Sequence, residues 1–229
     1  MKMMRGGLKG KERLIGAVIL VIAGVVGRIY LRGFLPDTPS WYITINGITQ
    51  PVFMMDLFFV VATVSLLSGL LIGGYYSFFV PLSTMILTDL YYGNNYIFLF
   101  TWSGFVMLGF LGFLLTTRTK LSLRTLPLLF GVGIGGVLLY DLWTNFGCWL
   151  GWYPHTLDGL LLCYTVAIPF TLWHLLSTTV ALSMVILPIL YLKDHGTIHV
   201  QYSVKPSEKI ATTVISTILI AFTPVTLFL

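Results

Sequence analysis

The feature that most constrains this chain is a series of long apolar segments that fills nearly its whole length. An α-helix needs about 20 mostly apolar residues to cross the hydrocarbon core of a bilayer, and segments near that length recur along the sequence. Charged residues make up only 9% of the chain, against about 25% in an average soluble domain. The sequence therefore predicts one polytopic membrane domain, an all-α helical bundle, with no room for a separate soluble domain of typical size.

Seven segments are candidates for spanning helices, namely 14–35, 52–72, 80–92, 96–116, 126–145, 170–192 and 210–229. The third is short, so we expect it to begin earlier, near Tyr76, or to be a short or tilted helix. Residues 157–168 are too few to cross and precede Pro169, which predicts an interfacial or re-entrant helix ending there. The predicted organisation is a basic N-terminus at 1–13, a six-helix core at 14–192, a linker at 193–209 and a seventh helix at 210–229.

Basic residues predict the orientation of the bundle. Eleven of the thirteen Lys and Arg lie in the N-terminal segment, near residues 118–124, or in 193–209. All three regions are cytoplasmic if the N-terminus is inside, as the preference of Lys and Arg for cytoplasmic connections requires. We therefore expect a multi-pass cell-membrane protein with its N-terminus in the cytoplasm and its C-terminus outside. The lipid bilayer is the expected partner, and a nucleic-acid partner is not expected, because the formal charge of +5 comes from these clusters.

Several ionisable residues fall at one depth, near the outer end of the predicted bundle. Asp56, Asp89, Asp141 and His174 lie on four predicted helices, and Arg28 lies in the outer turns of the first. Ionisable side chains within membrane segments are costly, and they normally face the bundle interior, paired or lining a polar cavity. The pattern predicts one outward-facing pocket around these groups. A structural Arg–Asp pair remains an alternative, and His174 is often only an interhelical hydrogen-bonding group in such a position.

Aromatic residues follow Asp141 in the stretch LLYDLWTNFGCWLGWYPHTLDGLL. We expect Trp149 and Tyr153 in a loop that covers the pocket, either as interfacial belt residues or as a lid that stacks on a ligand. Cys148 and His155 are possible metal ligands, but no third ligand accompanies them at a characteristic spacing, so neither a metal nor another cofactor is predicted. The full set of candidate substrate-binding residues is Arg28, Asp56, Asp89, Asp141, Asn145, Trp149, Tyr153, His155 and His174.

Small residues on the first predicted helix suggest a contact with another helix. Gly16, Ala23 and Gly27 would allow a close approach, either by a partner subunit or by neighbouring helices of the same bundle. No zincin, nucleophile-elbow, P-loop or aspartate-rich motif is present, so an enzyme is not predicted.

Three stretches carry a family resemblance: VPLSTMILTDLYYG, FTWSGFVMLGFLGFLL and DLWTNFGCWLGWYPHTLDGLLLCYTVAIPF. They resemble an uncharacterised family of prokaryotic integral membrane proteins described as putative transport proteins, over most of residues 52–192. The matching motif positions are Asp89, Asp141, Asn145, Tyr153, Pro154, Thr156, Gly159, Cys163 and Tyr164. The final segment, 210–229, resembles an addition to the six-helix core of that family.

At a coarser level the family resembles the substrate-binding S components of energy-coupling factor transporters. Those are six-helix proteins with an outer substrate pocket and a small-residue face on the first helix for an energising module. The resemblance implies a membrane transport subunit that takes a small solute, a vitamin or a precursor, from the outer side, with such a module as its partner. The alternative is a structural or accessory subunit of a larger membrane complex, in which the charges are internal ion pairs.

Overall fold

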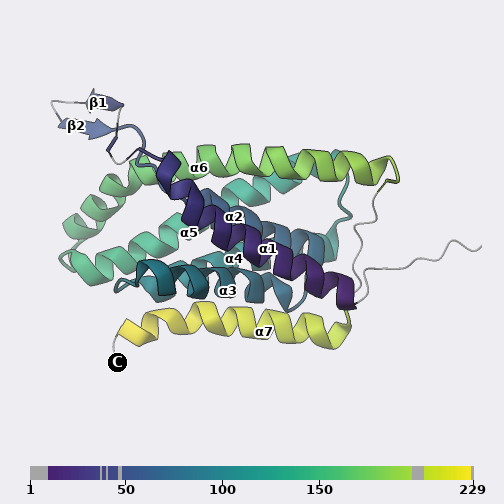
Figure 1. The fold of residues 1–229 in the computed structure, drawn as a ribbon. Helices are drawn as coiled ribbons and strands as arrows, with labels where there is room; N and C mark the ends of the chain where they lie inside the picture. Colours follow the sequence, from purple (N-terminus) through teal and green to yellow (C-terminus); the bar gives the residue numbers. More distant parts are fainter. Residues whose placement is uncertain (1–9, 37, 40, 46–47, 198–203, 228–229) are drawn as a thin grey trace, which may run out of the picture.

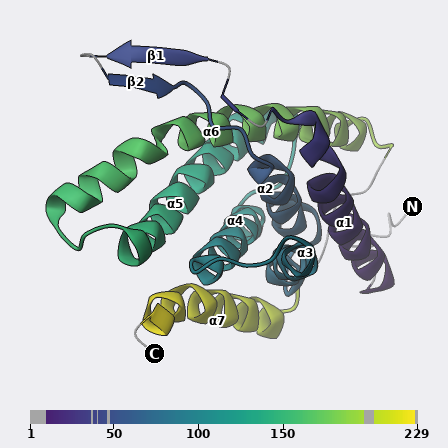
Figure 2. The same ribbon diagram turned by 60° about the vertical axis from the view of Figure 1, so that its left-hand side comes forward.

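The computed structural model describes residues 10–36, 38–39, 41–45, 48–197 and 204–227. In this part of the chain, seven α-helices form a bundle, and two short strands form a hairpin at one end of it (Figures 1 and 2). Five of the helical segments are long and apolar enough to cross a membrane. The all-α class is therefore confirmed, although fewer helices than the seven predicted meet that criterion. Parts of the predicted basic N-terminus, the linker and the last segment lie outside the described residues.

The first three helices lie close together. Helix α1 spans Gly10–Tyr30 and continues as a 3-10 turn at Leu31–Phe34. Helix α2 spans Phe58–Leu67, and nearly all of its residues are buried, so it lies inside the bundle. A π-helical turn at Ser68–Ile72 follows, and then helix α3, Tyr76–Tyr92, which begins where the sequence suggested.

The remaining helices are longer on average. Helix α4 spans Phe98–Arg118 and α5 spans Leu126–Trp152. Helix α6 spans Leu157–Asp194, and α7 spans Pro206–Phe222 before a 3-10 turn at Thr223–Leu227. In Figure 1, α1 and α7 both begin at the same end of the bundle, opposite the hairpin.

Strands β1, Tyr42–Ile45, and β2, Ile48–Pro51, form an antiparallel hairpin that the sequence analysis did not predict. The helix predicted to begin at residue 52 begins only at Phe58. The connection between β2 and α2 is held on α6, because Met54 N donates to Pro169 O at 3.2 Å and Trp173 Nε1 donates to Asp56 O at 2.8 Å.

Helix α6 differs most from its prediction. The expected interfacial segment 157–168 is the first part of a continuous helix of 38 residues. At 1.5 Å per residue it is about 57 Å long, well beyond a hydrocarbon core of about 30 Å. Pro169 does not end this helix, but the helix bends in its first half, where Pro169 removes a backbone donor (Figure 1).

Helix α4 packs against its neighbours almost backbone to backbone. A Cβ atom on Gly69 would lie 2.0 Å from Gly109 O, and a Cβ on Gly109 would lie 2.0 Å from Ser77 O. No side chain fits in either place, so glycine permits contact between α4, the π-helical turn and α3.

Three glycines of α1 face the same bundle. A Cβ on Gly27 would lie 2.9 Å from Val60 Cγ1, and one on Gly16 would lie 3.4 Å from Ile72 Cδ1. Gly24 is buried against Thr84 and Val64, whereas Ala23 is exposed. All three glycines thus take part in internal packing, and docking of a partner through Gly16, Ala23 and Gly27 stays a prediction.

Helix α7 contacts α4 and α3. Its first turn is fixed by Glu208, whose Oε1 accepts a hydrogen bond from Arg13 Nη2 of α1 at 2.6 Å. Arg13 Nη2 also donates to Gly73 O at 3.0 Å. One ion pair therefore ties the first turns of α1 and α7 to the turn before α3.

Candidate functional site

Two cavities lie side by side at the hairpin end of the bundle. Cavity 1 has a volume of about 240 Å³ and is lined by, among others, Arg28, Asp56, Asp89, Asn94, Thr101 and Tyr140. Cavity 2 has a volume of about 300 Å³ and is lined by, among others, Asp141, Asn145, Cys148, Tyr153, Cys163 and His174. Thr101 and Tyr140 line both, so these two residues lie between the cavities.

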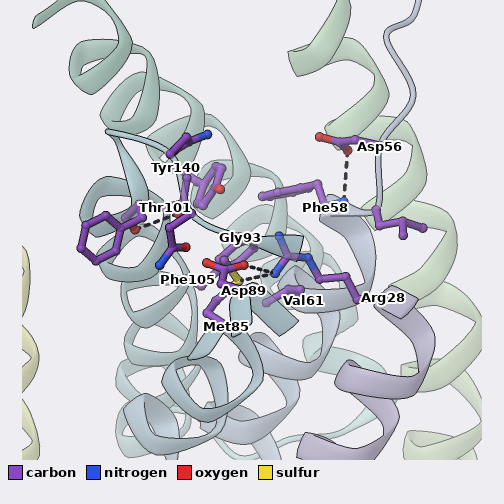
Figure 3. Close-up of a pocket in the computed structure, with 14 residues that line it drawn as sticks. Arg28, Asp56, Phe58, Val61, Met85, Asp89, Gly93, Thr101, Phe105 and Tyr140 are labelled. Carbon is purple, nitrogen blue, oxygen red and sulfur yellow. Dashed lines mark hydrogen bonds and ion pairs between the residues drawn. The ribbon is translucent and has the colours of Figure 1, made fainter. Parts of the chain in front are cut away.

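Cavity 1 contains an ion pair that joins α1 to α3. Arg28 Nη1 lies 2.6 Å from Asp89 Oδ1, and it also donates to Thr88 Oγ1. The other carboxylate oxygen, Asp89 Oδ2, accepts from Trp102 Nε1 on α4 at 2.7 Å. Each carboxylate oxygen of Asp89 therefore has a hydrogen-bond donor. Because the side chain is only 7% exposed, these donors remove much of the cost of burying its charge. Figure 3 shows Arg28 reaching toward Asp89 within the cavity, with Asp56 apart from them.

Across the bundle, His174 of α6 bridges two carboxylates. Its Nδ1 lies 2.6 Å from Asp141 Oδ1, and its Nε2 lies 3.0 Å from Asp56 Oδ2. The side chains of His174 and Asp141 are buried, whereas that of Asp56 is 40% exposed. Asp56 Oδ1 also accepts from Phe58 N at 3.0 Å at the start of α2. The bridge links Asp141 of cavity 2 to Asp56 of cavity 1.

Aromatic rings hold this bridge in place and separate the cavities. The rings of Phe58 and His174 stack with centroids 4.0 Å apart, and Tyr140 packs on Phe58 at 4.6 Å and on Phe105 at 4.7 Å. Rings packed in this way restrict the rotamers available to His174, so both of its nitrogens stay directed at carboxylates.

The structure thus divides the predicted pocket. Arg28, Asp56 and Asp89 line cavity 1, whereas Asp141, Asn145, Tyr153 and His174 line cavity 2. The sequence predicted that all seven lie at one end of the bundle. It did not predict that the ring of Tyr140 lies between the cavity 1 group and the cavity 2 group. Arg32, one turn after Arg28, is exposed and lies outside both linings.

The predicted aromatic loop over the pocket is only partly a loop: Tyr153 lies in the connection after α5 and lines cavity 2, whereas Trp149 is helical. Trp149 belongs to α5, which continues to Trp152, and only the four residues 153–156 connect α5 to α6. Neither Trp149 nor His155 lines cavity 1 or cavity 2. Trp149 Nε1 donates to Pro154 O at 3.0 Å, and His155 Nε2 lies 2.9 Å from Leu150 O. Both side chains therefore fix the turn between the helices.

The motif YPxTxxG builds this turn. Thr156 caps α6 by accepting from Gly159 N at 3.1 Å, and a Cβ on Gly159 would lie 2.2 Å from Pro154 O. Further along α6, Tyr164 Oη donates to Leu142 O at 2.7 Å. These motif positions hold α5 and α6 together beside cavity 2.

Sequence reasoning missed two groups of lining residues. Tyr140 and Thr101 occupy apolar helices without a distinguishing pattern, so only the packed structure reveals them. Asn94 and Asn95 follow Gly93 between α3 and α4 and line cavity 1. Paired amides in a short connection beside Asp89 were a usable signal, because connections carry binding residues disproportionately often.

These features define a class: a polytopic helical membrane protein with a charged cavity and a more apolar cavity at one end. The chain belongs to DUF6580, a family of unknown function, whose sequence profile matches residues 9–197. The match ends before α7. No curated protein and no solved structure matches the chain.

Proposed function

We propose that this protein is a membrane transport subunit that binds a small polar solute in cavity 1. The observation that carries the proposal is the lining of that cavity, where Arg28, Asp56 and Asp89 gather in an otherwise apolar bundle. Charged groups inside a membrane bundle are retained mainly where they pair or form a pathway for a solute. The S-component-like role and a vitamin-like cargo belong to the same proposal and rest on the sequence resemblance.

Unused hydrogen-bonding groups support the proposal. The hydrogen bonds described for the Arg28 side chain all come from Nη1, although a guanidinium has five N–H donors. Asn94 and Thr101 add neutral polar groups to the wall. At about 240 Å³, the cavity is just below the range of about 300–1,000 Å³ for typical ligand pockets, which favours a compact solute.

The test is gentle purification from the native membrane, followed by mass spectrometry of co-purifying small molecules and proteins. Arg28→Lys keeps a positive charge for Asp89 but loses the guanidinium fork. We expect the wild-type chain to carry a stoichiometric solute and Arg28→Lys to lose most of it. Arg32→Lys is the matched control, since Arg32 is exposed and outside the cavity, and should retain the solute.

Two results would overturn the proposal. One is a solute that Arg28→Lys retains at the wild-type level. The other is a wild-type chain that carries no small molecule but purifies in a fixed ratio with other membrane proteins, which would identify an accessory subunit.

A further inference from the structure

One carboxylate oxygen of Asp141 has no hydrogen-bond partner within the described part of the chain. Oδ1 faces His174 Nδ1 at 2.6 Å, whereas Oδ2 is buried and unpartnered. Asp141 is only 5% exposed and lines cavity 2, not cavity 1. A buried carboxylate oxygen without a donor is costly. A ligand in cavity 2 that carries an N–H or O–H group would remove this cost.

The charge of the bridge favours a cationic ligand. A neutral imidazole has one N–H and the imidazolium has two, so only the imidazolium donates to both Asp141 and Asp56. In that state two negative carboxylates and one positive ring leave a net charge of −1. The neighbouring Arg28–Asp89 pair is neutral by itself and does not compensate it. One further positive charge beside Asp141 Oδ2 would balance the cluster in its apolar surroundings.

The other walls of cavity 2 suit an apolar body. Trp152, Phe170, Val166 and Ala167 contribute aromatic and aliphatic surface. Asn145 adds a neutral amide on the same helix as Asp141, one turn further along. The cavity of about 300 Å³ is at the lower limit of typical ligand pockets, so the matching molecule is compact, with a single charged end.

We propose that cavity 2 is a second binding site, which takes an organic amine with one protonated nitrogen and a compact apolar body. The ammonium group donates to Asp141 Oδ2, and the body lies among Trp152, Val166 and Phe170. The site is distinct from the solute site of cavity 1, and it does not depend on the proposed transport function.

The test uses the whole chain in lipid nanodiscs, with 2-phenylethylamine as the probe. The neutral alcohol 2-phenylethanol has the same apolar body and controls for partition into the lipid. The two cysteines of the chain, Cys148 and Cys163, both line cavity 2, so a bound probe should slow their modification by methyl methanethiosulfonate. Mass spectrometry gives the rate at each cysteine.

We expect half-maximal protection by the amine at a concentration about 10- to 100-fold below that needed for the alcohol, because a hydrogen bond between charged groups is the stronger one. Asp141→Asn should abolish this preference. Asp158→Asn, at the exposed start of α6, is the matched control and should keep it.

Equal protection by amine and alcohol in the wild-type chain would overturn the inference, even if Asp141→Asn does not fold. So would an amine preference that persists in a folded Asp141→Asn variant. Since the cysteines report on cavity 2 alone, either result leaves the solute test of cavity 1 unaffected.

Discussion

Replacing His174 by phenylalanine tests whether the bridge between the two aspartates is a structural necessity. Phenylalanine keeps a ring for the stack on Phe58, where the centroids lie 4.0 Å apart, but it donates no hydrogen bond. The side chain of Asp56 is 40% exposed and stays hydrated, whereas the side chain of Asp141 is 6% exposed and loses its described partner. Removing one partner of a buried charged pair costs about 3–5 kcal/mol. For a chain of this length 1 kcal/mol lowers the melting temperature by about 2–4 °C, so we expect a decrease of about 6–20 °C.

The assay is thermal unfolding in detergent, followed by size-exclusion chromatography of the protein that remains soluble. The double variant His174→Phe with Asp141→Leu separates the charge effect from loss of packing, because it removes the unpaired carboxylate as well. We expect it to recover at least half of the lost stability, since apolar replacement of a whole buried pair is often neutral. The reasoning fails if the single variant melts within about 2 °C of the wild type, or if the double variant is no more stable than the single one.

Two further predictions concern packing. Gly109→Ala would place a methyl group 2.0 Å from Ser77 O, so α4 must shift by about 1 Å to reach the 3.0 Å that Cβ contacts require. We expect the free energy of unfolding to fall by about 3 kcal/mol or more in the same thermal assay. The control Gly135→Ala meets nothing within 4 Å and should not lower the melting temperature. Glu208→Gln removes the negative partner of Arg13, and we expect a loss of about 1.5–3 kcal/mol that raises the hydrogen-exchange rate of α7, relative to the wild type, more than that of α4. An equal rise in both helices, or the same rise from Lys209→Gln at an exposed position, would contradict the role of this ion pair.

The apolar runs predicted the helical bundle because lipid offers no hydrogen-bond partner to backbone N–H and C=O groups. A segment that crosses the bilayer must therefore bond its own backbone, as a helix does. Their ends were harder to predict. The stretch after Asp141 contains Gly147 and Gly151, which suggest a loop, yet α5 continues to Trp152 because these glycines pack against Phe100 and Tyr96. Pro169 suggested a helix end, but α6 continues through it. The carbonyl oxygen of Pro169 also accepts a hydrogen bond from Met54 N.

The hairpin carried a signal that the hydropathy pattern concealed. Residues 43–49, ITINGIT, alternate apolar and polar side chains on both sides of an Asn-Gly pair. Asn-Gly is the most favoured sequence in a two-residue hairpin turn. Because a long apolar segment follows, the predicted helix began at residue 52 and not at Phe58. A local turn signal therefore deserved more weight than hydropathy at this point.

The sequence predicted the position of the charged residues along their helices, but not which of them pair with one another. Depth follows from sequence position along each helix, so the charged residues were correctly brought to one end. Which charge meets which depends on helix rotation and on aromatic side chains. Arg28 meets Asp89, and His174 meets Asp141 and Asp56, because Phe58 and Tyr140 fill the space between the two groups.

The glycine contacts of α4 have a consequence for motion. Where backbone meets backbone, as at Gly69 and Gly109, no flexible side chain can absorb a displacement, so α3, α4 and the π-helical turn move as one body. Helix α1, which carries Arg28, lies on one side of this body, and the α5–α6 pair, which carries Asp141 and His174, lies on the other. Thr101 of α4 and Tyr140 of α5 line both cavities, so a displacement of this body against α5 would change the shapes of both cavities together.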